Sequence, residues 1–277
     1  GMASSFPAPR IYCIPATKAP VVAVFRRGPT EWAHIGKWNL AHNTYEPGAW
    51  LHGRLFPRRS DLSPDGQWLC YFAHKPNATW EHGPTYIALS KLPWLTALHA
   101  WSTCGTWTRG YYFSEDESSA ALNSSALPIP YSLLPIPIIQ FAQERRRGWL
   151  ESPDSPPRHR TDAWDQHRKA RLYKPQPGSK GVLHVESLGW AGGEFSAGQA
   201  VDGLRVLYSL EVVGELEILD DLQWADWDQQ GRLLVATRSG RLQIRKLNGR
   251  DFLTEFDVDL GQLQPDPVEP PDWATHW

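Results

Sequence analysis

A tight turn followed by an apolar run occurs three times along this chain. The turns close at Gly66, Gly203 and Gly231, and each is followed by β-branched, aromatic and leucyl side chains. Glycine readily adopts the positive φ that such turns require, and the residues after it suit a buried strand. The pattern predicts a hairpin that is repeated along one chain, and therefore an all-β fold of antiparallel sheet units.

Two of the predicted units match over three successive strands. The strands are expected at 50–56, 68–73 and 86–92 in the earlier unit and at 222–227, 233–237 and 242–247 in the later one. A simpler hairpin over 21–27 and 32–40, with its turn at Gly28, precedes them. Residues 181–190 and 204–219 are expected to complete a further unit.

The chain between these units is less regular. Residues 101–113 predict one or two strands, and 127–141 is an apolar run broken by prolines, which suits an edge strand or a polyproline II segment. Residues 142–174 combine prolines with an excess of basic side chains, and we expect a polar surface insertion there. The proline-rich tail after Leu263 is expected to be extended and to lie against the body of the protein.

The composition agrees with many short strands joined by turns. The chain has 24 Pro and 22 Gly but one Met, so helix breakers are frequent. Its 277 residues fit one all-β domain, and we expect a single domain over 1–277. The 15 Trp are expected mainly in the core between sheets, rather than as stacking platforms for a ligand.

Charge and cysteine content limit the expected partners. A formal net charge of −2 gives no general attraction to nucleic acid or to an anionic membrane, so neither is expected as a partner. Cys13, Cys70 and Cys104 have no CxxC spacing and suit reduced, buried thiols. The cytoplasm is the expected compartment, and the alternative of a secreted protein whose leader has been removed stays open.

The turn Ser63-Pro64-Asp65-Gly66 before a strand resembles the turn between the innermost and second strands of β-propeller blades, including WD-repeat and prolyl-oligopeptidase-type propellers. The resemblance covers residues 46–100 and 200–250 and implies a β-propeller of about five blades, within a range of four to six. The spacing from Gly203 to Gly231 is shorter than one four-stranded blade. Either one blade lacks a strand, or the hairpin at Gly203 is placed differently from the other two.

No linear catalytic signature occurs in the sequence, and no metal or cofactor is predicted. His184 and Glu186 share a strand face, which suits a metal or an acid/base pair, but a cross-strand polar pair on a solvated face is favoured. Carboxylates at or near the predicted turns are interpreted as turn residues rather than as a catalytic cluster. These carboxylates are Asp61, Asp65, Asp202, Asp226 and Asp228.

The propeller topology predicts one candidate site. Loops that join second to third strands share a face with loops that enter first strands. On this topology the face presents Arg26, Arg27, Arg58, Arg59, Trp80, His82, Trp224 and Arg238. Convergent guanidinium groups bind carboxylates and phosphates, which predicts a small anionic ligand or an acidic protein surface as partner. The competing interpretation is that these arginines solvate loops and pair with the acidic C-terminal third.

Two classes of function follow from these expectations. The preferred one is a ligand-binding or protein-interaction module with the site at the propeller mouth. The alternative is a hydrolase or lyase acting on a sugar or an anionic small molecule, with acid/base groups drawn from several blades. A buried carboxylate or histidine with a strongly shifted pKa in a polar pocket would favour the enzyme. A nucleic-acid binder built on the basic insertion is disfavoured by the net charge.

Overall fold

The computed structural model describes residues 7–28, 31–103, 105, 108–116, 127–159, 165, 168–190 and 202–277. The chain divides into two compact units. Unit 1 comprises Gly1–Tyr12 and Ile138–Gln264, and unit 2 comprises Cys13–Pro137 and Pro265–Trp277. None of the helices in the described ranges is both long and apolar enough to cross a membrane.

The prediction of an all-β protein is confirmed. The strands form five antiparallel sheets, and the one α-helix within the described residues is the short α1 (Ala142–Arg146). Each of the larger sheets is a meander of strands that neighbour each other in the sequence. The many Gly, Pro, Asn and Asp residues permit the short loops that join neighbouring antiparallel strands in such meanders.

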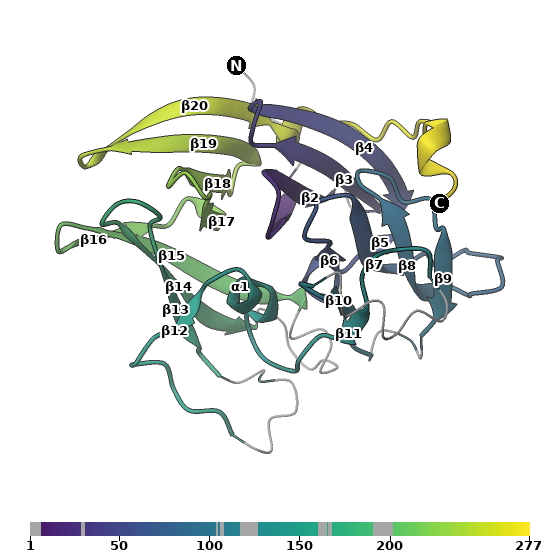
Figure 1. Ribbon diagram of the computed structural model, residues 1–277, viewed down its shortest axis with the longest axis horizontal. Helices are drawn as coiled ribbons and strands as arrows, with labels where there is room; N and C mark the ends of the chain where they lie inside the picture. The colour runs from purple at the N-terminus through teal and green to yellow at the C-terminus, as the bar shows by residue number, and fades with distance from the viewer. Residues whose placement is uncertain are drawn as a thin grey trace. The chain divides into compact units, whose positions relative to one another are not determined.

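The first sheet contains β1 (Arg10–Pro15), β2 (Val21–Arg27), β3 (Trp32–Asn39) and β4 (Thr44–His52) in that order, and Figure 1 shows β2, β3 and β4 side by side. The hairpin predicted around Gly28 is confirmed, with Gly28 at a φ of 113°. Strand β4 was not predicted: Trp50, expected to begin the first strand of the next unit, lies on the last strand of this sheet. Both faces of β2 and β3 are buried, which explains their nearly continuous apolar sequence.

The second sheet of unit 2 is built on β7 (Trp68–His74), β8 (Thr85–Lys91) and β9 (His99–Ser102). Its first strand is interrupted. Strand β5 (Arg54–Leu55) and β6 (Asp61–Leu62) both pair with β7, and the 3-10 helix η1 (Pro57–Arg59) lies between them. A two-stranded sheet of β10 (Tyr111–Phe113) and β11 (Leu133–Pro135) shares a core with this sheet, in which Phe72, Phe113 and Leu89 are fully buried.

The C-terminal tail docks on unit 2. Its last turn, η5 (Asp272–Ala274), ends where the Lys91 ammonium donates hydrogen bonds to the carbonyl oxygens of Trp273 (2.8 Å) and His276 (2.7 Å). The rings of Trp68 and Trp277 lie 5.7 Å apart. The expected extended tail therefore has specific anchors on this unit.

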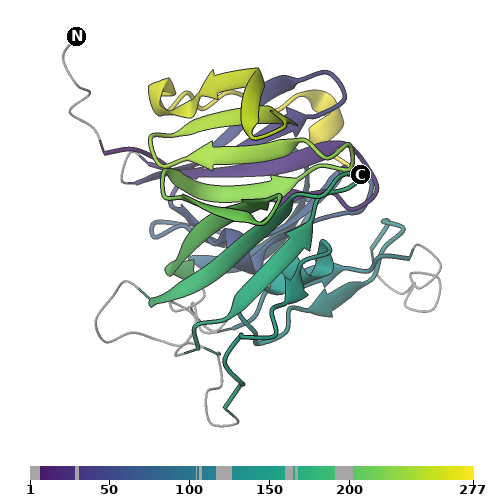
Figure 2. The same cartoon turned by 90° about the vertical axis from the view of Figure 1, so that its left-hand side faces the viewer.

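Unit 1 contains two sheets. The first consists of β12 (Leu150–Glu151), β13 (Arg171–Pro175), β14 (Val182–Trp190), β15 (Leu204–Val212) and β16 (Glu215–Leu219). The second consists of β17 (Leu222–Trp227), β18 (Leu233–Thr237), β19 (Arg241–Asn248) and β20 (Asp251–Asp259), followed by η4 (Leu260–Gln262). The strands of this second sheet are the yellow-green group in Figure 2. Strand β20 was not predicted, because its alternating charged residues lack the apolar run of the others.

The segment 142–174, expected as a surface insertion, contributes to the core of unit 1. Trp149, Ala170 and Leu172 are buried together with Leu183, Val185 and Tyr208. Two side chains on α1, Gln143 and Glu144, are also buried. The charged composition of this segment therefore reflects buried ion pairs as well as solvated positions.

The turns at Gly66 and Gly231 have the predicted conformation, with φ values of 75° and 78°. In both, an aspartate earlier in the turn accepts backbone N–H bonds: Asp65, one position before Gly66, from Gln67, and Asp228, three positions before Gly231, from Gln230 and Arg232. The third predicted turn differs. Asp202 and Gly203 directly precede β15, whereas the turn from β13 to β14 contains Gly178 at a φ of 70°. The hairpin at Gly203 is thus placed differently from the other two.

Candidate functional site

Three connections of unit 2 meet at Gly53. Its N–H donates to the carbonyl oxygen of Glu31 in the β2–β3 connection at 2.9 Å. A Cβ at Gly53 would lie only 2.5 Å from the carbonyl oxygen of His74, where β7 ends. The absence of a side chain lets these backbones approach closely. We call this region the connection end of unit 2, defined as residues 26–28, 31–32, 52–54 and 74–84.

Basic side chains collect at the connection end. Arg27 and Lys75 are exposed and Arg54 is half-buried, with its guanidinium carbon 5.2 Å from the centre of the Phe56 ring. Three histidines, His52, His74 and His82, lie on the same connections. Two carboxylates oppose them: Glu31 lies 3.1 Å from His52 Nε2, and Glu81 lies 3.3 Å from His82 Nε2. Cationic groups thus outnumber acidic ones here, which favours an anion.

Aromatic rings flank these charges. The Trp80 side chain is 36% exposed, and its indole N–H donates to the carbonyl oxygen of Gly83 at 2.8 Å. Its ring contacts His82 and Tyr86, with centroids 4.8 and 4.5 Å away. Trp32 stacks on His52 at 4.8 Å. Trp80 and His82, both predicted from the sequence, therefore lie together at this end, while Arg54 and Lys75 were missed because their strand ends were not located.

Arg26 takes a buried position in the first sheet. Arg26, His34 and Trp50 face one another across β2, β3 and β4 in one row of the pairing register. The Arg26 guanidinium is 5.5 Å from the Trp50 ring centre and donates to the carbonyl oxygen of Gly28. Trp50 stacks on the His34 imidazole at 4.3 Å. The row thus forms a cation–aromatic stack, with Arg26 tied to its own turn.

His34 is fully buried in this row. Its ring nitrogens lie 3.1 Å from the carbonyl oxygen of Ala49 and 2.9 Å from the Tyr45 hydroxyl. Burial lowers the pKa of His34 to about 4, and the nearby Arg26 charge adds to this. Tyr45 reaches His34 because Gly36 beneath its ring has no side chain; a Cβ there would lie 2.1 Å from the hydroxyl oxygen. His34 is therefore a neutral structural group at neutral pH.

Arg58 and Arg59 stand in η1, the interruption of the first strand. The Arg59 side chain is buried, stacks on Phe56 and Phe72 at 4.8 and 4.2 Å, and donates to the carbonyl oxygen of Thr108 at 2.9 Å. Arg58 is half-buried beside it. Arg59 is therefore a structural residue of the interior of unit 2 and not part of an exposed binding face.

The last two predicted residues belong to unit 1. Trp224 on β17 is 2% exposed and is part of the protein interior. Arg238 is exposed and donates hydrogen bonds to the carbonyl oxygens of Asp220 (2.8 Å) and Val206 (3.4 Å). The predicted set is thus divided, with six residues in unit 2 and two in unit 1.

The pair singled out on β14 forms cross-strand contacts. His184 Nε2 lies 3.0 Å from Glu211 on β15, and Glu186 lies 3.2 Å from the Arg171 guanidinium on β13. All four side chains are partly exposed. This confirms the favoured interpretation of a polar pair on a solvated face. Across the residues that the structure describes, no three His, Cys, Asp or Glu side chains are grouped so that they could hold a metal ion.

Asp226 departs from the expectation of a turn residue. It lies within β17, is buried, and accepts a bond from the Lys174 ammonium at 2.7 Å. Burial raises the pKa of Asp226, and the Lys174 charge opposes that effect. Nearby Glu144 accepts from the Tyr12 hydroxyl at 2.9 Å. We call Tyr12, Glu144, Lys174 and Asp226 the acid–base cluster of unit 1.

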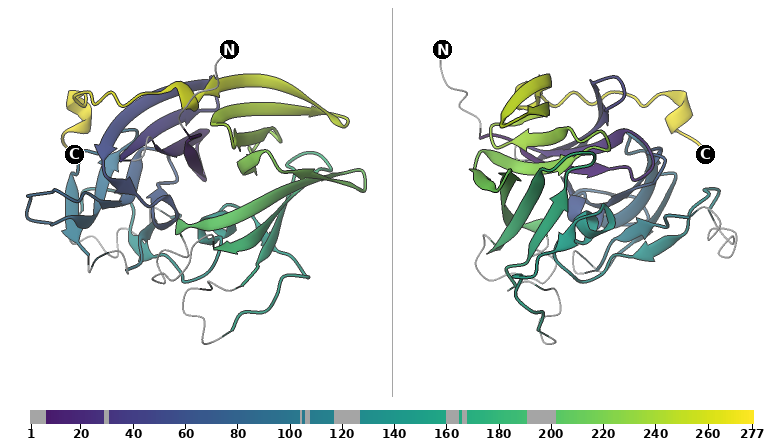
Figure 3. Two further views of the ribbon diagram at one scale, coloured as in Figure 1. Left: turned by 180° about the vertical axis from the view of Figure 1, so that it is seen from behind. Right: turned by 60° about the vertical axis from the view of Figure 1, so that its left-hand side comes forward.

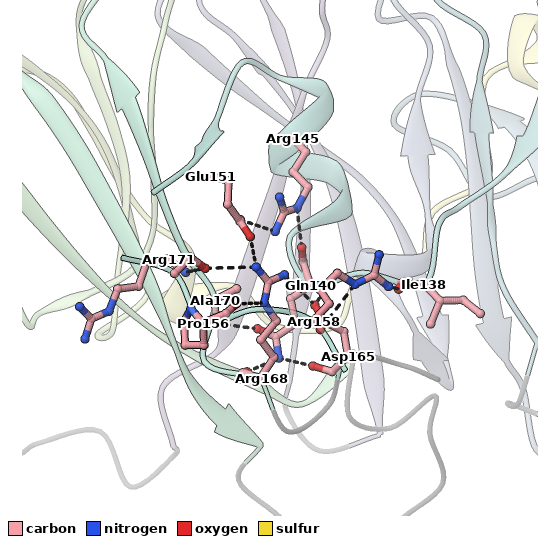
Figure 4. Close-up of polar contacts among 11 residues, drawn as sticks. Ile138, Gln140, Arg145, Glu151, Pro156, Arg158, Asp165, Arg168, Ala170 and Arg171 are labelled. Carbon is pink, nitrogen blue, oxygen red and sulfur yellow. Dashed lines mark hydrogen bonds and ion pairs between the residues drawn. The ribbon is translucent and has the colours of Figure 1, made fainter. Parts of the chain in front are cut away.

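A further charged network holds the segment around α1 in place (Figure 4). Arg168 is buried and bonds to Glu151, to Asp165 at 3.4 Å and to the carbonyl oxygen of Pro156 at 2.7 Å. Glu151 also pairs with Arg145 at 2.9 Å. Gln140 joins the network by donating to the carbonyl oxygens of Asp165 and Arg168. Because each buried charge has an opposite partner, the network is a structural tie within unit 1.

Comparison with known proteins adds no relatives: no protein-family model matches the chain, and no curated protein matches it.

Proposed function

We propose that this protein is a binding module of the β-propeller type, with about five blades, whose connection end in unit 2 takes an anionic ligand. Five antiparallel sheets in chain order, of which the four larger ones are meanders, support the propeller. The observation that carries the ligand proposal is the meeting of three connections at Gly53, because it gathers Arg27, Arg54 and Lys75 at one end of the unit.

The chemistry of this end suits carboxylate, sulfate or phosphate groups. Arginine offers two parallel N–H donors to such a group, and lysine adds a compact charge. The exposed edge of Trp80 offers an apolar contact for the rest of a small molecule. Arg26 holds the β2–β3 connection in place, since its guanidinium donates to the Gly28 carbonyl oxygen and stacks on Trp50. An acidic protein surface offers the same carboxylate chemistry as a small ligand.

Thermal unfolding in the presence of inorganic phosphate tests this proposal. Phosphate should stabilise the wild type beyond a chloride control of equal ionic strength, by about 2.7 kcal/mol at 100 times its Kd. The excess should disappear in the double variant Arg54→Gln, Lys75→Gln. The matched control is Lys246→Gln, Arg250→Gln on unit 1, which removes the same charge. An equal phosphate response in both double variants would contradict the proposal.

The acid–base cluster favours a second candidate, a hydrolase or lyase acting on a sugar or an anionic small molecule. The specific observation is a buried Asp226 with a raised pKa beside Lys174, together with a second buried carboxylate, Glu144. A panel of nitrophenyl glycosides and nitrophenyl phosphate tests it. Turnover that is lost in Glu144→Gln, with an unchanged melting temperature, would support the enzyme; no turnover in the wild type would refute it for these substrates.

A further inference from the structure

Strand β16 has an inverted polarity. It is the outermost strand of its sheet and pairs only with β15 among the described strands. Leu216 and Ile218 on β16 are 63% and 60% exposed, whereas Glu215 and Glu217 occupy the alternate positions. Edge strands that cover a core normally place apolar side chains inward and charged ones outward. Here the register shows the reverse arrangement.

The pairing register fixes the two faces. Leu172, Val185, Tyr208 and Leu219 form one row across the sheet, and all four are buried in the core of unit 1. Ile218 lies in the adjacent row with Ser209 and His184, which is the solvated face. Leu216 pairs with Glu211 on that same face. Leu216 and Ile218 therefore point away from the core and have no apolar neighbour in their pairing rows on β15.

The same register leaves backbone groups open. A two-residue turn, Val213-Gly214, joins β15 to β16, so Val212 and Glu215 form the hydrogen-bonded pair that closes it. Hydrogen-bonded and non-hydrogen-bonded pairs alternate along an antiparallel ladder. It follows that Leu216 and Ile218 direct their N–H and C=O groups outward. The two exposed apolar residues are thus also the residues whose backbone can accept another strand. Figure 3 shows this green hairpin projecting from the sheet.

The turn itself is under strain. Val213 has a φ of 52° and Gly214 a φ of 77°, as in a type I′ turn. A β-branched side chain is strongly disfavoured in this conformation, and Val213 is 77% exposed, so packing does not explain its presence. Asparagine or glycine would form the turn at lower cost. The exposed valine extends the apolar surface of Leu216 and Ile218 at the tip of the hairpin.

Charge on this edge selects the occupant. Glu217 makes no ion pair among the described residues, and Glu215 is paired with the exposed Arg250 at 2.9 Å. A second copy of β16 paired in the centred antiparallel register would place Glu217 opposite its own counterpart, which is unfavourable. A strand that carries basic side chains at these positions would instead be favoured.

We propose that the open edge of β16 is a docking site for an extended segment of another protein. This segment adds to the sheet as an antiparallel strand. It places basic side chains opposite Glu215 and Glu217, and apolar side chains beside Leu216 and Ile218. Main-chain hydrogen bonds supply affinity and the alternating side chains supply specificity, as in other strand-addition complexes.

A fluorescein-labelled peptide of alternating lysine and valine is the probe, with binding followed by fluorescence anisotropy. We expect Glu217→Lys to weaken binding by about threefold to tenfold, because one cross-strand charge pair changes sign. The same variant should gain affinity for a peptide of alternating glutamate and valine. The matched control is Glu269→Lys, an exposed site on unit 2. An equal loss in both variants would show non-specific charge attraction and would overturn the proposal.

Two further measurements separate strand addition from other binding. Amide hydrogen exchange at Leu216 and Ile218 should slow when the peptide is added, and a peptide N-methylated at its central amides should not bind. Unchanged exchange, or equal binding of the methylated peptide, would overturn the proposal. The double variant Leu216→Thr, Ile218→Thr should lose peptide binding while keeping its melting temperature, since both side chains are exposed. Sedimentation showing that the wild type dimerises and this variant does not would identify a second copy as the occupant instead.

Discussion

Replacing His34 by glutamine should reduce the acid sensitivity of this protein. His34 is fully buried between Trp50, Tyr45 and the Ala49 carbonyl group, and the Arg26 guanidinium lies in the same row. Protonation would place a second positive charge beside Arg26 without solvent. Glutamine retains a donor and an acceptor for these partners but does not titrate.

The magnitude follows from the pKa. Burial lowers the pKa of His34 from 6.5 to about 4, so the folded state resists protonation that the unfolded state accepts. The contribution of neutral His34 to stability is complete above about pH 6.5 and is lost as the pH falls toward about 4. Between about pH 7.5 and about pH 5 the free energy of unfolding should fall by about 2 kcal/mol through this group, and by about 3 kcal/mol once the loss is complete.

Urea unfolding at a series of pH values measures this loss. Other titrating groups contribute equally to wild type and variant, so the difference between the two proteins isolates His34. From about pH 7.5 to about pH 5, the free energy of unfolding of wild type should fall by about 2 kcal/mol more than that of His34→Gln. Parallel pH profiles for wild type and His34→Gln would refute the argument.

Three further outcomes are expected. Gly53→Ala should lower the free energy of unfolding by about 1–3 kcal/mol and weaken phosphate binding, because the new Cβ would press on the His74 carbonyl oxygen. In the control Gly83→Ala, the new Cβ would meet no atom, so the cost should be only about 1 kcal/mol, from the positive φ at that position. Val213→Asn should stabilise unit 1 by about 1 kcal/mol in urea unfolding, and a loss of stability would show that the valine is not strained. Lys174→Met should destabilise by about 3–5 kcal/mol at neutral pH, since Asp226 is left buried without its partner, and the loss should diminish at low pH; an unchanged midpoint in urea would contradict this.

The sequence was most informative where local chemistry alone determines the conformation. The turns at Gly66 and Gly231 could be located without any tertiary information, because a glycine with positive φ and an aspartate one or three positions before it specify the turn locally. Gly203 was misleading because its Asp202-Gly203 dipeptide, shared with Asp65-Gly66, directly precedes β15, whereas Gly178 has a different local sequence. Strand β20 was missed for a related reason: its side chains are largely exposed, and its pairing with β19 is set by the partner rather than by an apolar pattern.

The candidate site could be predicted only in part. The positions of Trp80 and His82 at the connection end could be predicted, because strand order in an antiparallel meander indicates where the loops lie. The buried positions of Arg26, Arg59 and Trp224 depend on what packs over them, which no local pattern reveals. The acid–base cluster was missed because Glu144 and Asp226 are far apart in sequence, and each resembles an ordinary surface carboxylate until its surroundings are known.

Each unit is completed by the chain terminus that is remote from it in the sequence. Gln223 of unit 1 accepts from the N–H of Ile11 and donates to the carbonyl oxygen of Pro9, whereas the segment after Gln264 returns to unit 2. The contact between Ile11 and Gln223 spans 212 positions. At a ribosomal rate of about 5–20 residues per second, Gln223 is added roughly 10–40 s after Ile11. Neither unit can therefore be produced as one continuous fragment, and during synthesis the contacts of Pro9 and Ile11 with Gln223 form only after most of the chain has emerged.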